Sequence, residues 1–298
     1  MNITKKYIIA WWNAFRAFSL IIAIDSCLLG VVLAFKDGYH NYLNAILVML
    51  GGIFIQSGVN LINDFFEFKQ RKVEDKMAHL QIFGSERDNI EWIIFFSGLG
   101  FFALTIPIGL FLVYRTGIPL LILGLVGFVG GYFYTGEPFN YKKKGLGVFL
   151  VFFLMGVFMI VGSYYAVSGT YNKSILLISL PISSLVAHML LTNELRDYEA
   201  DAGFDIPTLT VRIGYIPSLV FYFVLLAFTY VFTFVLSNMW LFSHPLFVLL
   251  GLPFLIKPSI TLIRNKGSKR SVIPDMMIHH TVFGICFIGS YIYDMLII

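Results

Sequence analysis

Long apolar segments recur from one end of this sequence to the other. One of them, SILLISLPISSLVAHMLLT (174–192), contains no Lys, Arg, Asp or Glu. A helix of this length can cross the roughly 30 Å hydrocarbon core of a bilayer. Only 13% of the 298 residues are charged, which is about half of the share found in soluble domains. Because the apolar runs are unbroken rather than alternating, they predict an all-α, polytopic membrane protein and not a β-barrel.

We predict nine transmembrane helices. The expected ranges are 14–35, 41–66, 91–113, 118–135, 146–168, 174–194, 216–236, 241–257 and 277–297. With the N-terminus in the cytoplasm, 18 of the 21 Lys and Arg residues lie on the inner side and 3 on the outer side. Cytoplasmic loops carry an excess of basic residues, so this asymmetry supports both the helix count and the orientation. We therefore expect a multi-pass protein of the cell (inner or plasma) membrane, with 1–298 forming a single transmembrane domain.

The acidic residues gather at the cytoplasmic ends of two predicted helices. Nine of the 17 fall in two groups, which are Asp64, Glu67, Glu74 and Asp75, and Glu194, Asp197, Glu199, Asp201 and Asp205. Asn193, Asp197 and Asp201 are four residues apart, so they share one face if the helix continues that far. Asn60 and Asp64 have the same spacing in the first group. Either group alone fits an ordinary solvated helix end, but two such groups with matching spacing favour a functional site.

The residue types in these groups predict a metal-bridged phosphate site. Like charges four residues apart repel, and carboxylates at membrane depth are costly, so a shared cation would relieve both penalties. Oxygen ligands suit Mg²⁺, which proteins hold with a few carboxylates plus substrate phosphates. Neither group contains Cys, which argues against structural zinc. Arg196 and the run Lys142–Lys144 are the nearby cations expected to bind diphosphate oxygens.

Three segments occur in order at predicted helix ends. They are NLINDFFEF (60–68) followed by Glu74 and Asp75, GYFYTGEPFNYKKKGLGVF (131–149) and NELRDYEADAGFDIPTLTVRIG (193–214). Together they resemble the UbiA superfamily of intramembrane prenyltransferases, and most closely the 1,4-dihydroxy-2-naphthoate polyprenyltransferases of menaquinone synthesis. The resemblance covers most of the chain, and nine helices is the number in that family.

The resemblance implies helices around a central cavity, with two Mg²⁺ ions between two Asp-rich motifs on the cytoplasmic side. The metal ligands carried onto this chain are Asn63, Asp64, Glu67, Asp75 (or Glu74), Asp197 and Asp201. The substrate-binding residues are Asn63, Asn193, Tyr134, Lys142, Lys143 and Lys144, and the catalytic residues are Asp64, Glu67, Asp197, Asp201 and Arg196. Three residues depart from the family pattern. Glu67 stands in place of Asp, Glu137 in place of the second Gly of YTGGP, and Val148 in place of the Glu of GLGE.

The resemblance predicts Mg²⁺-dependent transfer of a polyprenyl group from a polyprenyl diphosphate to an aromatic acceptor, expected to be 1,4-dihydroxy-2-naphthoate. A terpene cyclase of the same architecture, or a prenyltransferase with another acceptor, is the alternative. A transporter is a third reading, disfavoured because transporters place such acids near mid-membrane. The expected partners are the two substrates and membrane lipid, with no nucleic acid. The sequence leaves the acceptor, the prenyl chain length, the choice between transferase and cyclase, and the oligomeric state open.

Overall fold

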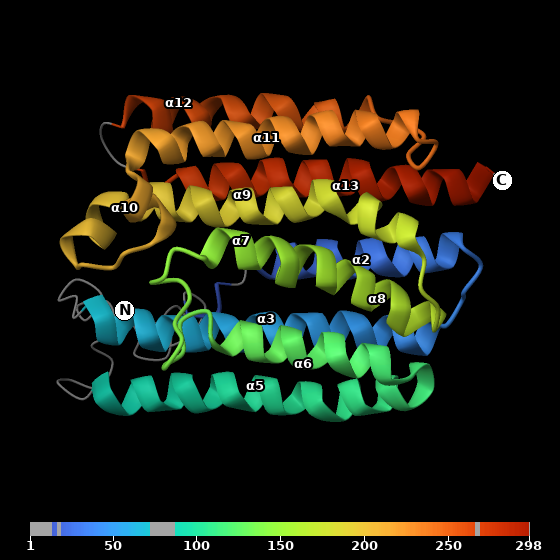
Figure 1. Cartoon of the computed structure of the whole chain (residues 1–298), viewed down its shortest axis with the longest axis horizontal. Coiled ribbons are helices and arrows are strands. Elements are labelled where there is room, and N and C mark those ends of the chain that lie inside the picture. Colours follow the sequence, from blue (N-terminus) through green and yellow to red (C-terminus); the bar gives the residue numbers. More distant parts are fainter. Residues whose placement is uncertain (1–13, 17–18, 72–86, 266–268, 298) are drawn as a thin grey trace, which may run out of the picture.

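All regular secondary structure in the described residues is helical (Figure 1). The computed structural model describes residues 14–16, 19–71, 87–265 and 269–297. The elements are α2 (Leu20–Lys36), α3 (Tyr42–Arg71), α5 (Arg87–Thr116), α6 (Ile118–Tyr132), α7 (Gly147–Val151), η2 (Phe152–Phe158), α8 (Met159–Ser168), α9 (Lys173–Gly203), α10 (Leu209–Ile213), α11 (Tyr215–Asn238), η3 (Phe247–Leu255), α12 (Ile256–Arg264) and α13 (Val272–Ile297). The all-α prediction is therefore confirmed for this part of the chain.

Seven helical runs in the described residues are long and apolar enough to cross a membrane. Two of them combine shorter elements, since α7, η2 and α8 form one run and η3 and α12 form another. Helix α6 has 15 residues and α2 has 17, so both are shorter than these seven. The protein is thus a multi-pass membrane protein, while the count of nine crossings stays a prediction.

The helices lie side by side along the long axis of the molecule (Figure 1). Helices α3, α5 and α6 form one edge, and α11, α12 and α13 form the other, with α2, α8 and α9 between them. The end of α3, the end of α9 and the connection 133–146 all lie at the same end of the bundle. The fold therefore brings the three segments that carried the resemblance to one end of the protein.

The second acidic motif is helical from Glu194 to Asp201, because α9 runs to Gly203 rather than ending near residue 194, and Asp205 lies in the turn that follows. Asn193, Asp197 and Asp201 therefore share a helical face, as their spacing predicts. The chain then turns after Gly203, where Ile206 N donates to Asp201 O at 2.8 Å. A prediction based on apolar residues ends this helix near residue 194, because the residues that follow are charged. The backbone hydrogen bonds of α9 nevertheless continue through these charged residues to Gly203.

Other predicted boundaries differ from the structure as well, since α13 begins at Val272 and α5 runs from Arg87 to Thr116. The predicted helix 241–257 is a 3-10 helix from Phe247 that continues as α12 to Arg264. Pro253 lies within this segment and has no N–H to donate, which disfavours a regular α-helix there. The predicted helix 14–35 is regular from Leu20 onward, and α3 continues to Arg71.

Glycine allows α2 and α8 to pack closely. A Cβ on Gly30 would collide with Ile160 O and would lie 2.7 Å from Ser163 Cβ and 2.8 Å from Tyr164 N. Small residues are typical where membrane helices approach at backbone distance. Two of these three neighbours are backbone atoms, which cannot move aside without shifting α8.

We therefore predict that Gly30→Ala destabilises the protein by about 1–3 kcal/mol, as overpacking does in a dense interior. Gly100→Ala is the matched control, since no atom lies within 4 Å of a Cβ built at this α5 position. The apparent Tm of the two purified variants should fall by several degrees for Gly30→Ala and stay near the native value for Gly100→Ala. Equal Tm values would contradict this account of the α2–α8 contact.

Candidate active site

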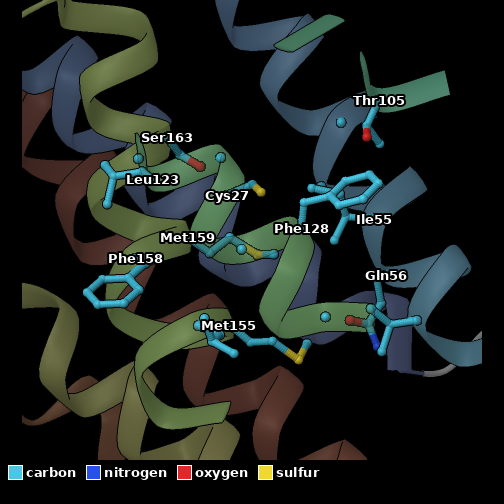
Figure 2. A pocket seen from close by; sticks show the side chains of 18 of the residues that line it. Cys27, Ile55, Gln56, Thr105, Leu123, Phe128, Met155, Phe158, Met159 and Ser163 are labelled. Carbon is cyan, nitrogen blue, oxygen red and sulfur yellow. The ribbon is translucent and has the colours of Figure 1, made fainter. Parts of the chain in front are cut away.

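A cavity of about 630 Å³ lies among α2, α3, α5, α6, α8 and α9. Its walls are mostly aliphatic and aromatic, and Figure 2 shows Ile55, Leu123, Phe128, Met155 and Phe158 around it. The few polar groups in that view are the side chains labelled Gln56, Thr105 and Ser163 together with the thiol of Cys27. Such a cavity suits an apolar ligand far better than a charged one.

One part of the cavity lining is strongly polar. Its residues come from the N-terminal segment, α3, the connection after α6, and α9, and they are Arg16, Asn60, Asn63, Tyr134, Asn193 and Arg196. Four of these six, Asn63, Tyr134, Asn193 and Arg196, are predicted site residues. The cavity thus combines an apolar body with a polar end formed where the two acidic motifs begin.

Glu67 holds two cations from distant parts of the chain. Its Oε2 accepts a hydrogen bond from Arg16 Nη2 at 2.6 Å, and its Oε1 accepts one from Lys142 Nζ. With its amide turned so that oxygen faces the guanidinium, Asn63 also accepts from Arg16, at 2.8 and 3.1 Å. Burial lowers the pKa of Arg16, but the charges of Glu67 and Asp64 outweigh burial and raise that pKa above its usual value. Arg16 is therefore a permanent cation at the polar end.

Arg16 is a site residue that the sequence reasoning missed. It entered only as one basic residue among the 18 assigned to the inner side. Its partner Glu67 is 51 residues away along the chain, and no local spacing rule connects them. The only available signal was a basic residue near the start of the first apolar segment, which is equally typical of a topology determinant.

In the second motif, Arg196 binds its neighbour Asp197 through two hydrogen bonds. Arg196 Nε donates to Oδ1 at 2.9 Å and Nη2 donates to Oδ2 at 2.7 Å. Arg196 also lines the cavity, so the pair lies at its edge. Asp201 is buried one turn further along α9, and Asp64 is half-buried on α3. All these predicted residues are at the same end of the bundle.

The three lysines of the predicted diphosphate-binding run have different environments. Lys142 is buried and reaches Glu67. Lys143 is half-buried and its carbonyl accepts a hydrogen bond from Arg212 at 2.8 Å. Lys144 is exposed, with its ammonium 5.5 Å from the centre of the Phe139 ring. The structure therefore brings Lys142 into the network at the polar end. Asp75 and Glu74 lie outside the described residues.

The donor set at this end of the bundle fits Mg²⁺ chemically. Carboxylates of Asp64, Asp197 and Asp201 and the amides of Asn63 and Asn193 are hard oxygen donors. No group of three or more His, Cys, Asp or Glu in the described part of the chain is arranged to hold a metal by itself. Mg²⁺ usually takes one or two protein carboxylates and completes its shell with water and substrate phosphate.

Tyr134 presents a neutral phenol to the cavity. Burial raises its pKa well above the usual value, and the nearby charges of Glu194 and Glu67 raise it further. The phenol therefore keeps its proton at any physiological pH and can donate a hydrogen bond. Its ring also offers a negative π face to a developing cation.

Curated relatives are named for prenyl transfer. The chain is 28% identical over 206 residues to a 1,4-dihydroxy-2-naphthoate octaprenyltransferase of Bacillus subtilis, and the match covers 68% of this chain and 66% of the relative, just under two thirds of its length. It is 25% identical over 268 residues to the UbiA prenyltransferase domain-containing protein 1 of Dictyostelium discoideum, covering 87% of this chain and 79% of that one.

Solved structures share the fold. A UbiA homologue from Archaeoglobus fulgidus bound to GPP and Mg²⁺ superposes with a TM-score of 0.62 at 17% identity, covering 95% of this chain and 98% of that one. The apo UbiA homologue from Aeropyrum pernix K1 gives a TM-score of 0.66 at 14% identity, with 92% and 98% covered. At these identities the likeness establishes the architecture alone.

The described residues form an all-helical fold around a cavity with an apolar body and a charged end. The model of the UbiA prenyltransferase family matches residues 24–279. The chain belongs to this family, and the resemblance seen in its three motif segments is confirmed.

The ion network at the polar end makes a stability prediction. Removing one charge from a buried pair leaves the partner uncompensated and costs about 3–5 kcal/mol. We therefore expect Glu67→Gln to lower the apparent Tm of the purified protein strongly, because it weakens the contacts of both Arg16 and Lys142. Asp275→Asn is the control, since its partner Lys257 is largely exposed and such pairs contribute about 0–1 kcal/mol. A Glu67→Gln protein as stable as the control would show that the network is not structural.

Proposed function

We propose that the protein transfers a polyprenyl group from a polyprenyl diphosphate to an aromatic acceptor in a Mg²⁺-dependent reaction, with 1,4-dihydroxy-2-naphthoate as the expected acceptor. The observation that carries this proposal is a cavity whose body is apolar and whose lining includes two arginines, Arg16 and Arg196, which pair with the carboxylates of Glu67 and Asp197 outside the lining. An amphiphile with a long apolar tail and a diphosphate head has the same two parts. The acceptor follows from the names of the curated relatives.

The polar end would hold the diphosphate. Mg²⁺, when bound, supplies positive charge that neutralises the departing diphosphate. Six oxygen-bearing side chains would hold the two expected ions, and they are Asn63, Asp64, Glu67, Asn193, Asp197 and Asp201. Arg16, Arg196 and Lys142 would donate charge-assisted hydrogen bonds to diphosphate oxygens, which strengthen as negative charge develops on the leaving group.

The cavity body would hold the prenyl chain and exclude water. As the bond between the allylic carbon and the diphosphate oxygen breaks, positive charge develops on that carbon. The π face of Tyr134 lies at the polar end, where it would stabilise this charge. The electron-rich acceptor ring would then form the new carbon–carbon bond, and the proton displaced from the attacked carbon would pass to the released diphosphate. Dry apolar walls protect the allylic cation from reaction with water.

The proposal also includes the orientation of the protein in the membrane and its domain organisation. The 18-to-3 distribution of basic residues supports a cytoplasmic N-terminus, which would open the polar end to water-soluble acceptors from the cytoplasm. One buried core connects residues from α2 to α13, which supports 1–298 as a single domain in the cell membrane.

The first test measures diphosphate release by the purified protein with Mg²⁺ and geranylgeranyl diphosphate, with and without 1,4-dihydroxy-2-naphthoate. We expect release that requires both the metal and the acceptor, and that is lost on chelation. The double variant Asp197→Ala, Asp201→Ala should abolish it. Release without an acceptor, with a hydrocarbon or alcohol product, would replace the transferase proposal with a cyclase. No release with any prenyl diphosphate would contradict both.

A second test concerns Arg16. Replacing it by Met removes a guanidinium from the polar end, and losing a charged hydrogen-bond partner costs about 1.5–3 kcal/mol. We therefore expect the KM for the donor diphosphate to rise by an order of magnitude or more in Arg16→Met. The KM of Arg16→Lys should lie between those of the native protein and Arg16→Met. Arg264→Met, at an exposed position of α12, is the control and should leave KM unchanged. An unchanged KM in Arg16→Met would exclude Arg16 from the donor site.

A further inference from the structure

Glu194 is a buried carboxylate of the second motif that has no role in the chemistry above. It follows cavity-lining Asn193 on α9 and is 2% exposed. Its Oε2 accepts a hydrogen bond from Thr210 N at 3.2 Å, whereas its Oε1 has no hydrogen-bond partner among the described residues. A buried oxygen without a partner is costly, and such groups cluster where a ligand or a moving side chain supplies the missing contact.

Lys142 interacts with both Glu194 and Glu67. Its ammonium pairs with Glu67 and also interacts electrostatically with Glu194. The backbone fixes its place, because Lys142 N donates to Tyr134 O at 3.0 Å. A Cβ on Gly147 would lie 3.5 Å from Glu194 Oε1 and 3.4 Å from Tyr134 Cε2. The carboxylate oxygen without a partner and the cavity-lining phenol therefore border the same position.

Several charges interact in this region. Arg16 interacts with Glu67 and Asp64, Lys142 interacts with Glu67 and Glu194, and Asp201 also acts on Glu194. If Glu67 turns toward a cation that arrives with the diphosphate, Lys142 loses the partner it has now. A buried ammonium without a counter-charge is strongly unfavourable. Glu194 Oε1 is an acceptor that can replace Glu67 as the partner of Lys142.

We propose that Glu194 is a positioning residue that receives the Lys142 ammonium when diphosphate and its cation occupy the polar end. The inference rests on the proposed function. Lys142 carries three N–H donors, so one can bind Glu194 while the others reach diphosphate oxygens. Lys142 thus exchanges one buried carboxylate for another and remains charged throughout. Glu194 acts through Lys142 and touches no substrate itself.

The test uses binding and does not require turnover. Purified protein is titrated with inorganic pyrophosphate and Mg²⁺ by isothermal calorimetry. Glu194→Gln keeps the size of the side chain and an acceptor for Thr210 N, and removes only the charge. We expect it to weaken pyrophosphate binding roughly tenfold or more, because a charge that supports a buried binding lysine is lost. Glu199→Gln is the matched control on α9, since its carboxylate is exposed and lies 3.9 Å from Lys269. It should bind like the native protein.

A double-variant cycle separates positioning from a general structural effect. Once Lys142→Met has removed the ammonium, adding Glu194→Gln should cause no further loss of affinity, because residues that act as one unit are not additive. Fully additive losses would overturn the inference. Should Glu194→Gln fail to fold, the same cycle is run with Glu194→Asp, whose shorter side chain withdraws the carboxylate. Coupling with Lys142→Met is expected again, and additivity again overturns it.

The outcomes distinguish this inference from the function on which it rests. Native protein that does not bind pyrophosphate with Mg²⁺ overturns the proposed function. Native binding with unchanged affinity in Glu194→Gln overturns the role of Glu194 alone.

Discussion

The polar end of the cavity depends on the two hydrogen bonds that Glu67 accepts from Arg16 and Lys142. These three residues come from the N-terminal segment, from α3 and from the connection between α6 and α7. The two cations, Arg16 and Lys142, would repel each other, and any of the three charges would be costly to bury alone. The carboxylate of Glu67 compensates much of this cost because it accepts hydrogen bonds from both cations. The network therefore fixes the relative positions of three segments that share no local sequence signal, and it places cations where an anionic ligand can use them.

The position of these charges would suit the proposed chemistry to a membrane. The cavity body is apolar and surrounded by helices that a bilayer can accommodate. A long prenyl chain can enter such a space without passing through water. The charged head remains at the end of the bundle, where helices stop and polar groups are tolerated. One molecule can thus bind the two incompatible halves of an amphiphile in adjacent environments.

The sequence predicts the parts of this architecture that depend on local patterns. Apolar runs predict the helical class, and the spacing of Asn193, Asp197 and Asp201 predicts a shared face that α9 then provides. Contacts between distant segments have no such pattern. The sequence treats Lys142–Lys144 as one basic run, but the turn after α6 buries the first lysine and exposes the third. The pairing of Arg16 with Glu67 is likewise set by packing, so it could be found only from the fold.

The central claim is that the ends of α3 and α9 form one diphosphate site, and a structure of the native protein in lipid nanodiscs tests it most directly. The protein would be studied by electron cryomicroscopy with Mg²⁺ and geranyl S-thiolodiphosphate, a donor analogue that resists cleavage. The account predicts diphosphate density between the two motifs, in contact with Arg16 and Arg196, with the prenyl chain in the apolar cavity. Density for the head group at any other place in the bundle would contradict it.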